Sequence, residues 1–291
     1  MSLPTLRQFD TMFPTELSCL TFLVENGVFY RTIQCPGCER PMKQLVEKGL
    51  FRCQTTRCKR RQLSIRKNSF FYGHKLECRQ ILRLALLWLA RVNVSSAVLL
   101  TGHGRQLICD FYNHFRQLVS SALSIEDTKI GGVNIEVEID ETKLGKVKYH
   151  RGHRVEGVWV LVGIERTDQK KIFLVPVETR DKESLMNIIT THVLPGSIIM
   201  TDCWKGYVDI VKYNDYKHFT VNHKYTFKDP ETGTCTNAAE GLNSGLKRRI
   251  PVRNRTKNGI DLHLAEYIWT RQNAKNLWPA LIDALANVHY Q

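Results

Sequence analysis

Three carboxylates in the second half of the chain have the positions expected of a divalent-metal site. Asp140 and Asp202 each follow an apolar run directly, and Glu240 lies at the start of a helical segment. Two Mg²⁺ ions about 3.5–4 Å apart can activate a water or a 3′-hydroxyl and stabilise the leaving oxygen during in-line attack on a phosphodiester. Mg²⁺ prefers hard oxygen ligands and keeps some of its waters, so three carboxylates are enough. Asn237 is the alternative third ligand, and any single acid has a solvated surface position as its alternative.

A lysine accompanies the third acid. Lys247 follows Glu240 by seven residues, which places both on the same face of a helix, two turns apart. Its ammonium would hold the substrate phosphate beside the metals. The helix that carries these residues is expected to begin with Thr236 or Asn237 as its N-cap.

A sheet is needed to bring the acids together. Residues 133–140 alternate strictly between apolar and polar side chains, which predicts a strand that ends at Asp140. Further strands are predicted over 157–165, 171–178, 197–201 and 217–221, with helices over 182–194, near 207–213 and from about 236. Three sequential strands followed by helix, strand, helix, strand and helix is the order of an RNase H-like domain, so the predicted fold class is α/β.

Four of the nine cysteines have zinc-ligand spacing. Cys35 and Cys38 flank a Pro-Gly turn, and Cys53 and Cys58 follow with four residues between them. The pattern predicts a zinc ribbon over about residues 31–62. Its Zn²⁺ would be structural, because four sulfur ligands leave no open coordination position. The alternative is a set of ordinary buried thiols.

The pattern becomes helical after the ribbon. The first predicted helix contains the apolar run of residues 81–89 and ends near Asn93, and further helices are predicted from Ser95 or Ser96 to 100 and over 105–119 after a glycine turn. Three helices with a glycine turn before the third match a helix-turn-helix, which would place Arg105 and Arg116 of the third helix at a DNA major groove. The alternative is a small helical bundle without a DNA-binding role.

The charge of the chain favours a polyanionic partner. Its 42 Lys and Arg against 28 Asp and Glu give a formal charge of +14. Residues 31–91 hold 15 basic and three acidic residues, and residues 241–260 hold six basic residues and no acid. Two basic clusters favour contact with a phosphate backbone over a solvated face. The DNA-contacting candidates in these clusters are Lys59, Arg60, Arg61, Lys247, Arg248 and Arg249.

Two other features limit the possible classes of protein. No stretch approaches the roughly 18 uncharged apolar residues of a membrane span, and acids interrupt the first thirty residues where a secretory signal would be apolar. We therefore expect neither a transmembrane segment nor a signal peptide. His150 and His153 lie in a basic loop and are interpreted as DNA-facing or solvated residues rather than metal ligands.

Seven motifs together resemble the DDE transposases of the Merlin superfamily and their bacterial insertion-sequence relatives. The likeness extends over residues 13–272, and the order and spacing of the motifs make it specific. The motifs are Phe13-Pro14-Thr15-Glu16, the four-cysteine ribbon, Ile139-Asp140-Glu141-Thr142, Asp202-Cys203-Trp204-Lys205-Gly206-Tyr207, Val221-Asn222-His223, Thr236-Asn237-Ala238-Ala239-Glu240-Gly241 and Leu264-Ala265-Glu266-Tyr267-Ile268-Trp269.

The resemblance implies an RNase H-like core and cut-and-paste strand transfer of double-stranded DNA with Mg²⁺ or Mn²⁺. It also implies a homodimer or larger assembly on transposon ends. By the family pattern the catalytic acids are Asp140, Asp202 and Glu240, and some bacterial relatives use Asn as the third, which keeps Asn237 open. His223 matches a family histidine, with strand-end packing as its alternative role. The residues that depart from the family pattern are Asn243 and Cys203, and neither is expected to touch an acid.

Three domains are predicted: residues 1–74 with the ribbon, 75–128 with the helix-turn-helix, and 129–291 with the catalytic domain and C-terminal helices. The leading hypothesis is a DNA transposase, located in the nucleus if the host is eukaryotic and in the cytoplasm otherwise. One alternative is a domesticated, transposase-derived DNA-binding regulator without strand-transfer activity. A zinc-dependent RNA-binding protein is the other.

Overall fold

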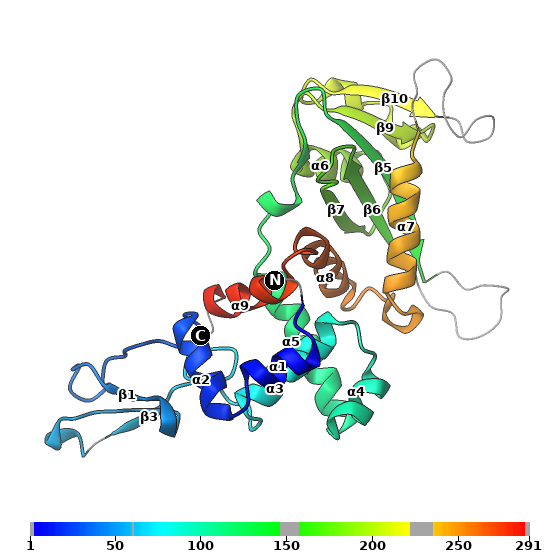
Figure 1. The fold of residues 1–291 in the computed structure, drawn as a ribbon. Helices are drawn as coiled ribbons and strands as arrows, with labels where there is room; N and C mark the ends of the chain where they lie inside the picture. Colours follow the sequence, from blue (N-terminus) through cyan, green and yellow to red (C-terminus); the bar gives the residue numbers. More distant parts are fainter. Residues whose placement is uncertain (1–2, 60, 146–156, 222–234, 289–291) are drawn as a thin grey trace. The chain divides into compact units, whose positions relative to one another are not determined.

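The chain forms two compact units in the computed structural model, which describes residues 3–59, 61–145, 157–221 and 235–288 (Figure 1). Unit 1 comprises Met1–Ala122 and Asn273–Gln291, and unit 2 comprises Leu123–Gln272. The C-terminal helix therefore belongs to unit 1, whereas the predicted catalytic domain extended to residue 291. Within the described ranges, no helix has the length and apolar character that a membrane crossing requires.

Unit 1 is helical apart from the ribbon. The aromatic ring of Trp278 packs edge-on against Phe9 and also lies against Phe13, and these contacts hold the last helix in this unit. Helix α4 (Val94–Thr101) is capped by Asn93, whose side chain accepts from the N–H of Ser96. The sequence had predicted Ser95 or Ser96 as the cap. The helices of unit 1 are α1 (Leu6–Met12), α2 (Glu16–Glu25), α3 (Cys78–Leu89), α4 (Val94–Thr101), α5 (Arg105–Ser121) and α9 (Leu277–Asn287).

Glu16, the acid of the Phe13-Pro14-Thr15-Glu16 motif, has a structural role in unit 1. The Glu16 carboxylate accepts hydrogen bonds from the N–H groups of Cys78 (2.8 Å) and Arg79 (2.9 Å) at the start of α3. It also forms an ion pair with Arg66. A carboxylate at a helix N-terminus satisfies N–H groups that have no intrahelical partner and interacts favourably with the helix dipole.

Unit 2 contains a five-stranded sheet with the strand order β10-β9-β5-β6-β7. Its strands are β5 (Glu136–Leu144), β6 (Val158–Glu165), β7 (Ile172–Val177), β9 (Ile198–Asp202) and β10 (Lys217–Val221). The first three are mutually antiparallel, whereas β9 is parallel to β5 and β10 is parallel to β9. A separate parallel pair joins β4 (Ile130–Gly131) to β8 (Val193–Leu194).

Two local predictions for unit 2 are wrong. Strand β5 does not end at Asp140, because it pairs with β6 residue by residue up to Leu144 opposite Val158. The helix predicted near residues 207–213 is instead two 3₁₀ turns, Lys205–Tyr207 and Ile210–Lys212.

Helices cover both faces of the sheet (Figure 1). Helix α6 (Lys182–His192) packs against a core that includes Ile139 and Phe173. Helices α7 (Asn237–Arg249) and α8 (Ile260–Gln272) pack on the opposite face. Because successive side chains of a strand point to opposite faces, Glu138 and Asp140 of β5 face α7.

A glycine in the sheet provides a test of this packing. Gly163 lies opposite Phe173 on the neighbouring strand, and a Cβ on Gly163 would lie only 2.1 Å from the Phe173 ring. We expect Gly163→Ala to lower the free energy of unfolding of unit 2 by about 1–3 kcal/mol, the usual cost of overpacking. In urea unfolding, the same substitution on a Phe173→Leu background should lower the free energy of unfolding by less. An equal loss on both backgrounds would show that the added methyl group does not clash with the Phe173 ring.

Candidate active site

Asp140 and Asp202 lie on neighbouring parallel strands. Residues 136–138 of β5 pair with residues 198–200 of β9, and the same register continued by two residues brings Asp140 level with Asp202. Both side chains share the strand parity of Glu138 and therefore the face covered by α7. The charges of both aspartates also act on the carboxyl group of Glu141. The structure thus brings these two predicted acids into one cluster.

Hydrogen-bond donors orient both aspartates. Asp140 accepts from the backbone N–H of Glu141 (2.8 Å) and from Nδ2 of Asn243 on α7 (2.7 Å). Asp202 accepts from the backbone N–H of Trp204 (3.0 Å). The expectation that Asn243 touches no acid is therefore wrong, because its side chain is buried between α7 and the sheet with its amide directed at Asp140. For Cys203, which is exposed, the described residues show no contact with an acid.

The N-terminus of α7 is held by Glu138. The carboxylate of Glu138 accepts from the N–H groups of Ala238 (2.7 Å) and Ala239 (3.0 Å). Thr236 occupies the N-cap position, but its side chain makes no capping hydrogen bond. A residue 100 positions away in the sequence from Ala238 thus replaces the local cap that the sequence predicts.

Arg166 balances the charge of Glu138. The Glu138 side chain is only 1% exposed, and it forms an ion pair of 2.5 Å with Nε of Arg166. The same guanidinium pairs with Glu136 (2.9 Å), which is 42% exposed, and donates to the carbonyl of Cys235 just before α7. Glu136, Glu138 and Asp140 alternate along β5, so their shared face was visible in the sequence, but nothing in the sequence marked Arg166 as their partner.

Helix α7 places Glu240, Asn243 and Lys247 along one flank. These residues have the i, i+3, i+7 spacing of one helical face, and the bond from Asn243 to Asp140 sets this flank beside the aspartates. Glu240 and Lys247 are exposed. At 3.6 residues per turn, Glu240 lies about 60° around the helix from Asn243, whereas Asn237 lies about 120° away. The geometry therefore favours Glu240 over Asn237 as the third ligand, because Glu240 lies nearer to the side of α7 that contacts Asp140.

Glu141, the neighbour of Asp140 on β5, is a half-buried acid that sequence reasoning missed. Burial, together with the charges of Asp202 and Asp140, raises the pKa of its carboxyl to about 7, although a hydrogen bond with Tyr207 lowers it. Only its place in the Ile139-Asp140-Glu141-Thr142 motif could have indicated a role.

One oxygen beside Asp140 tests whether a cation fits. Among the described residues, Oδ1 of Asn243, whose Nδ2 donates to Asp140, is buried without a hydrogen-bond partner. Buried oxygens in proteins normally accept a hydrogen bond or bind a cation. The surrounding ligands are carboxylate and amide oxygens, which are the donors that hard divalent cations prefer. The site therefore fits Mg²⁺ or Mn²⁺.

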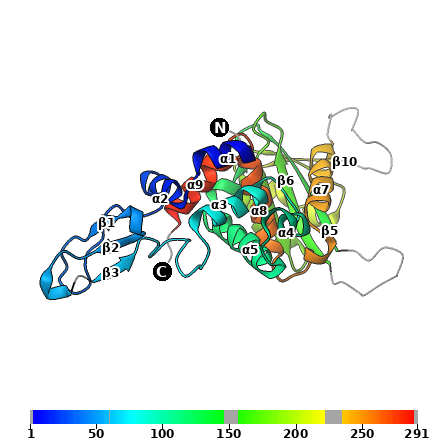
Figure 2. The ribbon, with the colours of Figure 1, turned by 60° about the horizontal axis from the view of Figure 1, so that its bottom comes forward.

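Four sulfurs in unit 1 form a second candidate metal site. The ribbon is an antiparallel sheet of β1 (Lys43–Leu45), β2 (Leu50–Arg52) and β3 (Gln62–Ser64) (Figure 2). The Sγ atoms of the four predicted ligands lie within 4.8 Å of one another, and those of Cys38 and Cys53 are 3.6 Å apart. The predicted ligands brought together in this way are Cys35, Cys38, Cys53 and Cys58.

Hydrogen bonds shift the pKa values of two of these thiols in opposite directions. A hydrogen bond from the backbone of Arg40 lowers the pKa of Cys38 to about 6, whereas the hydrogen bond between Cys58 and Cys38 raises the pKa of Cys58 to about 12. Four thiolates can coexist at this separation only around a cation that compensates their charge. Four sulfur donors fit a closed, tetrahedral Zn²⁺ site.

The predicted DNA-contacting residues are distributed over both units. Lys59, Arg61 and Arg105 are exposed in unit 1, where Arg105 also donates to Ser95 (3.2 Å), and Arg116 is half-buried. Lys247 and Arg248 are exposed on α7, but Arg249 pairs with the buried carboxylate of Glu266 on α8 (2.8 Å). This pair gives Arg249 a structural role. The predicted residues outside the described ranges are Arg60, His150, His153 and His223.

Comparison with known proteins finds similar domains among transposases. Residues 129–268 match the family model of the ISXO2-like transposase domain, a segment that contains the sheet, both aspartates and α7. A protein of Haemophilus influenzae described as an uncharacterized transposase-like protein is 28% identical over 106 residues, which are 36% of this chain and 84% of that protein. Both matches support the resemblance to insertion-sequence transposases that the motifs predicted.

The attachment of α7 to the sheet can be tested through the two glutamates that share Arg166. Glu138→Ala removes a buried ion-pair partner and uncaps α7, so we expect a loss of about 3–5 kcal/mol in the free energy of unfolding. Glu136→Ala removes a half-exposed partner of the same arginine and should cost about 0–1 kcal/mol. Chemical denaturation measures both, and similar losses would contradict this role of Glu138.

Proposed function

We propose that the protein is a DDE transposase that cleaves and joins double-stranded DNA with two divalent metal ions. The observation that carries the proposal is the meeting of Asp140 and Asp202 on neighbouring parallel strands, with the Glu240 flank of α7 held beside them by Asn243. The sheet order supports an RNase H-like core, because two parallel strands extend an antiparallel three-stranded unit from the side of its first strand. Helices on both faces are also expected of such a core.

Each residue of the site has a defined task in this proposal. Asp140, Asp202 and Glu240 would hold Mg²⁺ or Mn²⁺, which activates the attacking oxygen and stabilises the leaving oxygen of the phosphodiester. Asn243 is a positioning residue, since its amide fixes the orientation of the Asp140 carboxylate. Lys247 lies on the same flank and would hold the phosphate that reacts.

Unit 1 would supply the recognition of transposon ends. Helices α4 and α5 are joined through Gly102, which has the left-handed backbone (φ 70°) that a tight turn between two helices favours. The exposed N-terminal part of α5 carries Arg105, and the ribbon carries Lys59 and Arg61 beside its second cysteine pair. We propose that these elements bind double-stranded DNA and that the protein acts as a homodimer or larger assembly. The bacterial origin of the similar protein favours a bacterial cytoplasm over a nucleus as the place of the reaction.

The catalytic proposal predicts a specific loss of DNA processing. Purified protein with Mg²⁺ and a duplex that carries the ends of its own element should give nicked and joined products. Asp140→Asn and Asp202→Asn should abolish them, and Asn243→Ala should lower the rate about 10- to 100-fold, as is usual when a group that orients a metal ligand is lost. Asp215→Asn is the matched control, because this exposed turn residue loses the same charge outside the cluster. DNA binding without any product from the wild type would favour the regulator instead.

The zinc proposal predicts one tightly bound Zn²⁺ per chain in the purified protein. Elemental analysis should show that Cys35→Ser loses this metal, and DNA binding should weaken because the ribbon depends on zinc to fold. Cys203→Ser, which alters an exposed thiol outside the cluster, should keep both properties. Retained zinc in Cys35→Ser, or unchanged DNA binding without zinc, would refute the role of the ribbon.

A further inference from the structure

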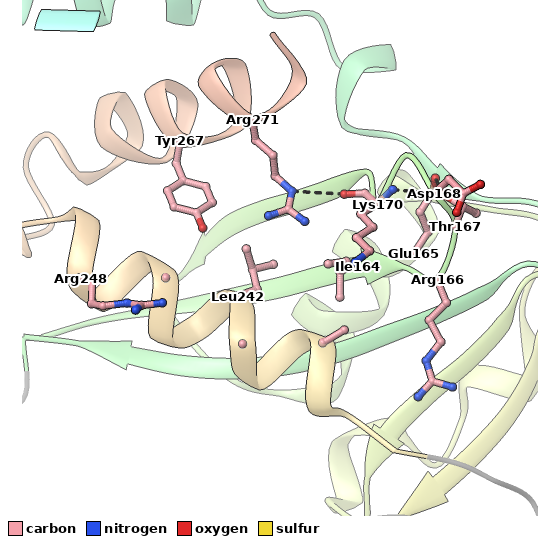
Figure 3. Close-up of a pocket in the computed structure, with 13 residues that line it drawn as sticks. Ile164, Glu165, Arg166, Thr167, Asp168, Lys170, Leu242, Arg248, Tyr267 and Arg271 are labelled. Atoms are coloured by element: carbon pink, nitrogen blue, oxygen red, sulfur yellow. Dashed lines mark hydrogen bonds between the residues drawn. The ribbon is translucent and has the colours of Figure 1, made fainter. Parts of the chain in front are cut away.

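A basic groove lies on the flank of α7 that faces away from the aspartates. We call it the α7–α8 groove; it is bounded by α7, by α8 and by the turn between β6 and β7, and its volume is about 830 Å³ (Figure 3). Gly241, Gly245 and Arg248 line it from α7, at the i, i+4, i+7 spacing of one helical flank. At 3.6 residues per turn these positions lie about 140–160° around α7 from Asn243. The groove is therefore separate from the carboxylate site.

Three cations give the α7–α8 groove its charge. Arg248 lines it from α7, Arg271 from α8 and Lys170 from the turn. Nε of Arg271 donates to the carbonyl of Lys170 (3.3 Å), which leaves the terminal nitrogens of this guanidinium for a ligand. Figure 3 shows Tyr267 and Arg271 directed from α8 toward α7. In the part of the chain that the structure describes, neither Arg248 nor the Lys170 ammonium has an ion-pair partner.

The acidic residues of the α7–α8 groove do not cancel this charge. Glu165 is 5% exposed, and its two oxygens accept from the N–H of Gly131 (3.0 Å) and the hydroxyl of Thr167 (2.6 Å). Asp168 is an exposed residue of the turn. Arg166 also lines the groove, but its guanidinium is engaged by Glu136 and Glu138. Three cations thus face one solvated carboxylate, which favours an anionic ligand.

Gly241 indicates where that ligand approaches. A glycine destabilises a helix interior relative to alanine. At Gly245 the structure explains the residue, because a Cβ there would lie 2.6 Å from the hydroxyl of Tyr267. At Gly241 a Cβ would meet nothing within 4 Å, so packing does not require the glycine. The missing side chain leaves the helix backbone open to close approach from the α7–α8 groove.

We propose that the α7–α8 groove binds the phosphodiester backbone of DNA, at a place separate from the phosphate that reacts at the carboxylates. This inference rests on the proposed function, because the ligand is the DNA that the carboxylate site processes. A helix with its side chains is about 10–12 Å wide, close to the roughly 12 Å width of the major groove. Helix α7 can therefore lie in a major groove with Lys247 toward one strand and Arg248 toward the other.

The salt dependence of DNA binding tests the proposal. The probe is a short duplex of arbitrary sequence, measured without added Mg²⁺ so that no cleavage occurs. Loss of one phosphate contact should reduce the slope of log K against log salt by about 1, which we expect for Arg248→Gln and for Lys170→Gln. Lys171→Gln is the matched control, since Lys171 is exposed next to Lys170 but does not line the groove. Unchanged slopes, or an equal change in the control, would overturn the proposal.

A second variant separates ligand contact from folding. Gly241→Ala should raise the melting temperature, because alanine favours the helix, and should nevertheless weaken DNA binding. A stabilised variant with unchanged affinity would contradict the proposed approach of DNA at this position.

Inorganic tripolyphosphate distinguishes a small ligand from DNA. If tripolyphosphate binds the wild-type protein but not Arg248→Gln, while the two proteins bind DNA equally, the groove serves free phosphates and the proposal fails. Failure of wild type to bind any DNA would refute the proposed function itself.

Discussion

Two carboxylates of β5 hold α7 against the sheet, and the geometry of the candidate active site depends on these bonds. Glu138 accepts from the first N–H groups of the helix, and Asp140 accepts from Asn243 further along it. Hydrogen bonds to charged groups contribute about 1.5–3 kcal/mol each. Because Glu240 lies between these two points of attachment, the bonds that fix α7 also fix the third acid relative to Asp140.

This arrangement requires charge compensation, which Arg166 provides. A carboxylate as buried as Glu138 would be strongly destabilising without a partner. Arg166 pairs with it, contacts Glu136 on the same strand face and donates to Cys235, the residue just before the N-cap of α7. One arginine thus connects two carboxylates of β5 to the segment that leads into α7. Asp140, which follows Glu138 on the same face, accepts from the neutral amide of Asn243.

Local sequence patterns predicted the parts of the fold that local physics determines. Strand-like apolar runs located the strands β6, β7, β9 and β10, and cysteine spacing located the four sulfurs that converge in the ribbon. The errors arise from contacts between distant parts of the chain. Strand β5 continues past Asp140 because β6 pairs with it, and α9 joins unit 1 because Trp278 contacts Phe9. The bond from Asn243 to Asp140 spans 103 residues and has no local signature.

The central claim is that Asp140, Asp202 and Glu240 form a two-metal site, whose geometry depends on the attachment of α7 to β5. Anomalous diffraction at the manganese edge, from crystals soaked in MnCl₂, tests it most directly. The account predicts two manganese peaks about 3.5–4 Å apart, bound by these three carboxylates, with Asn243 still bonded to Asp140. Well-ordered crystals that show no manganese between Asp140 and Asp202 would contradict it.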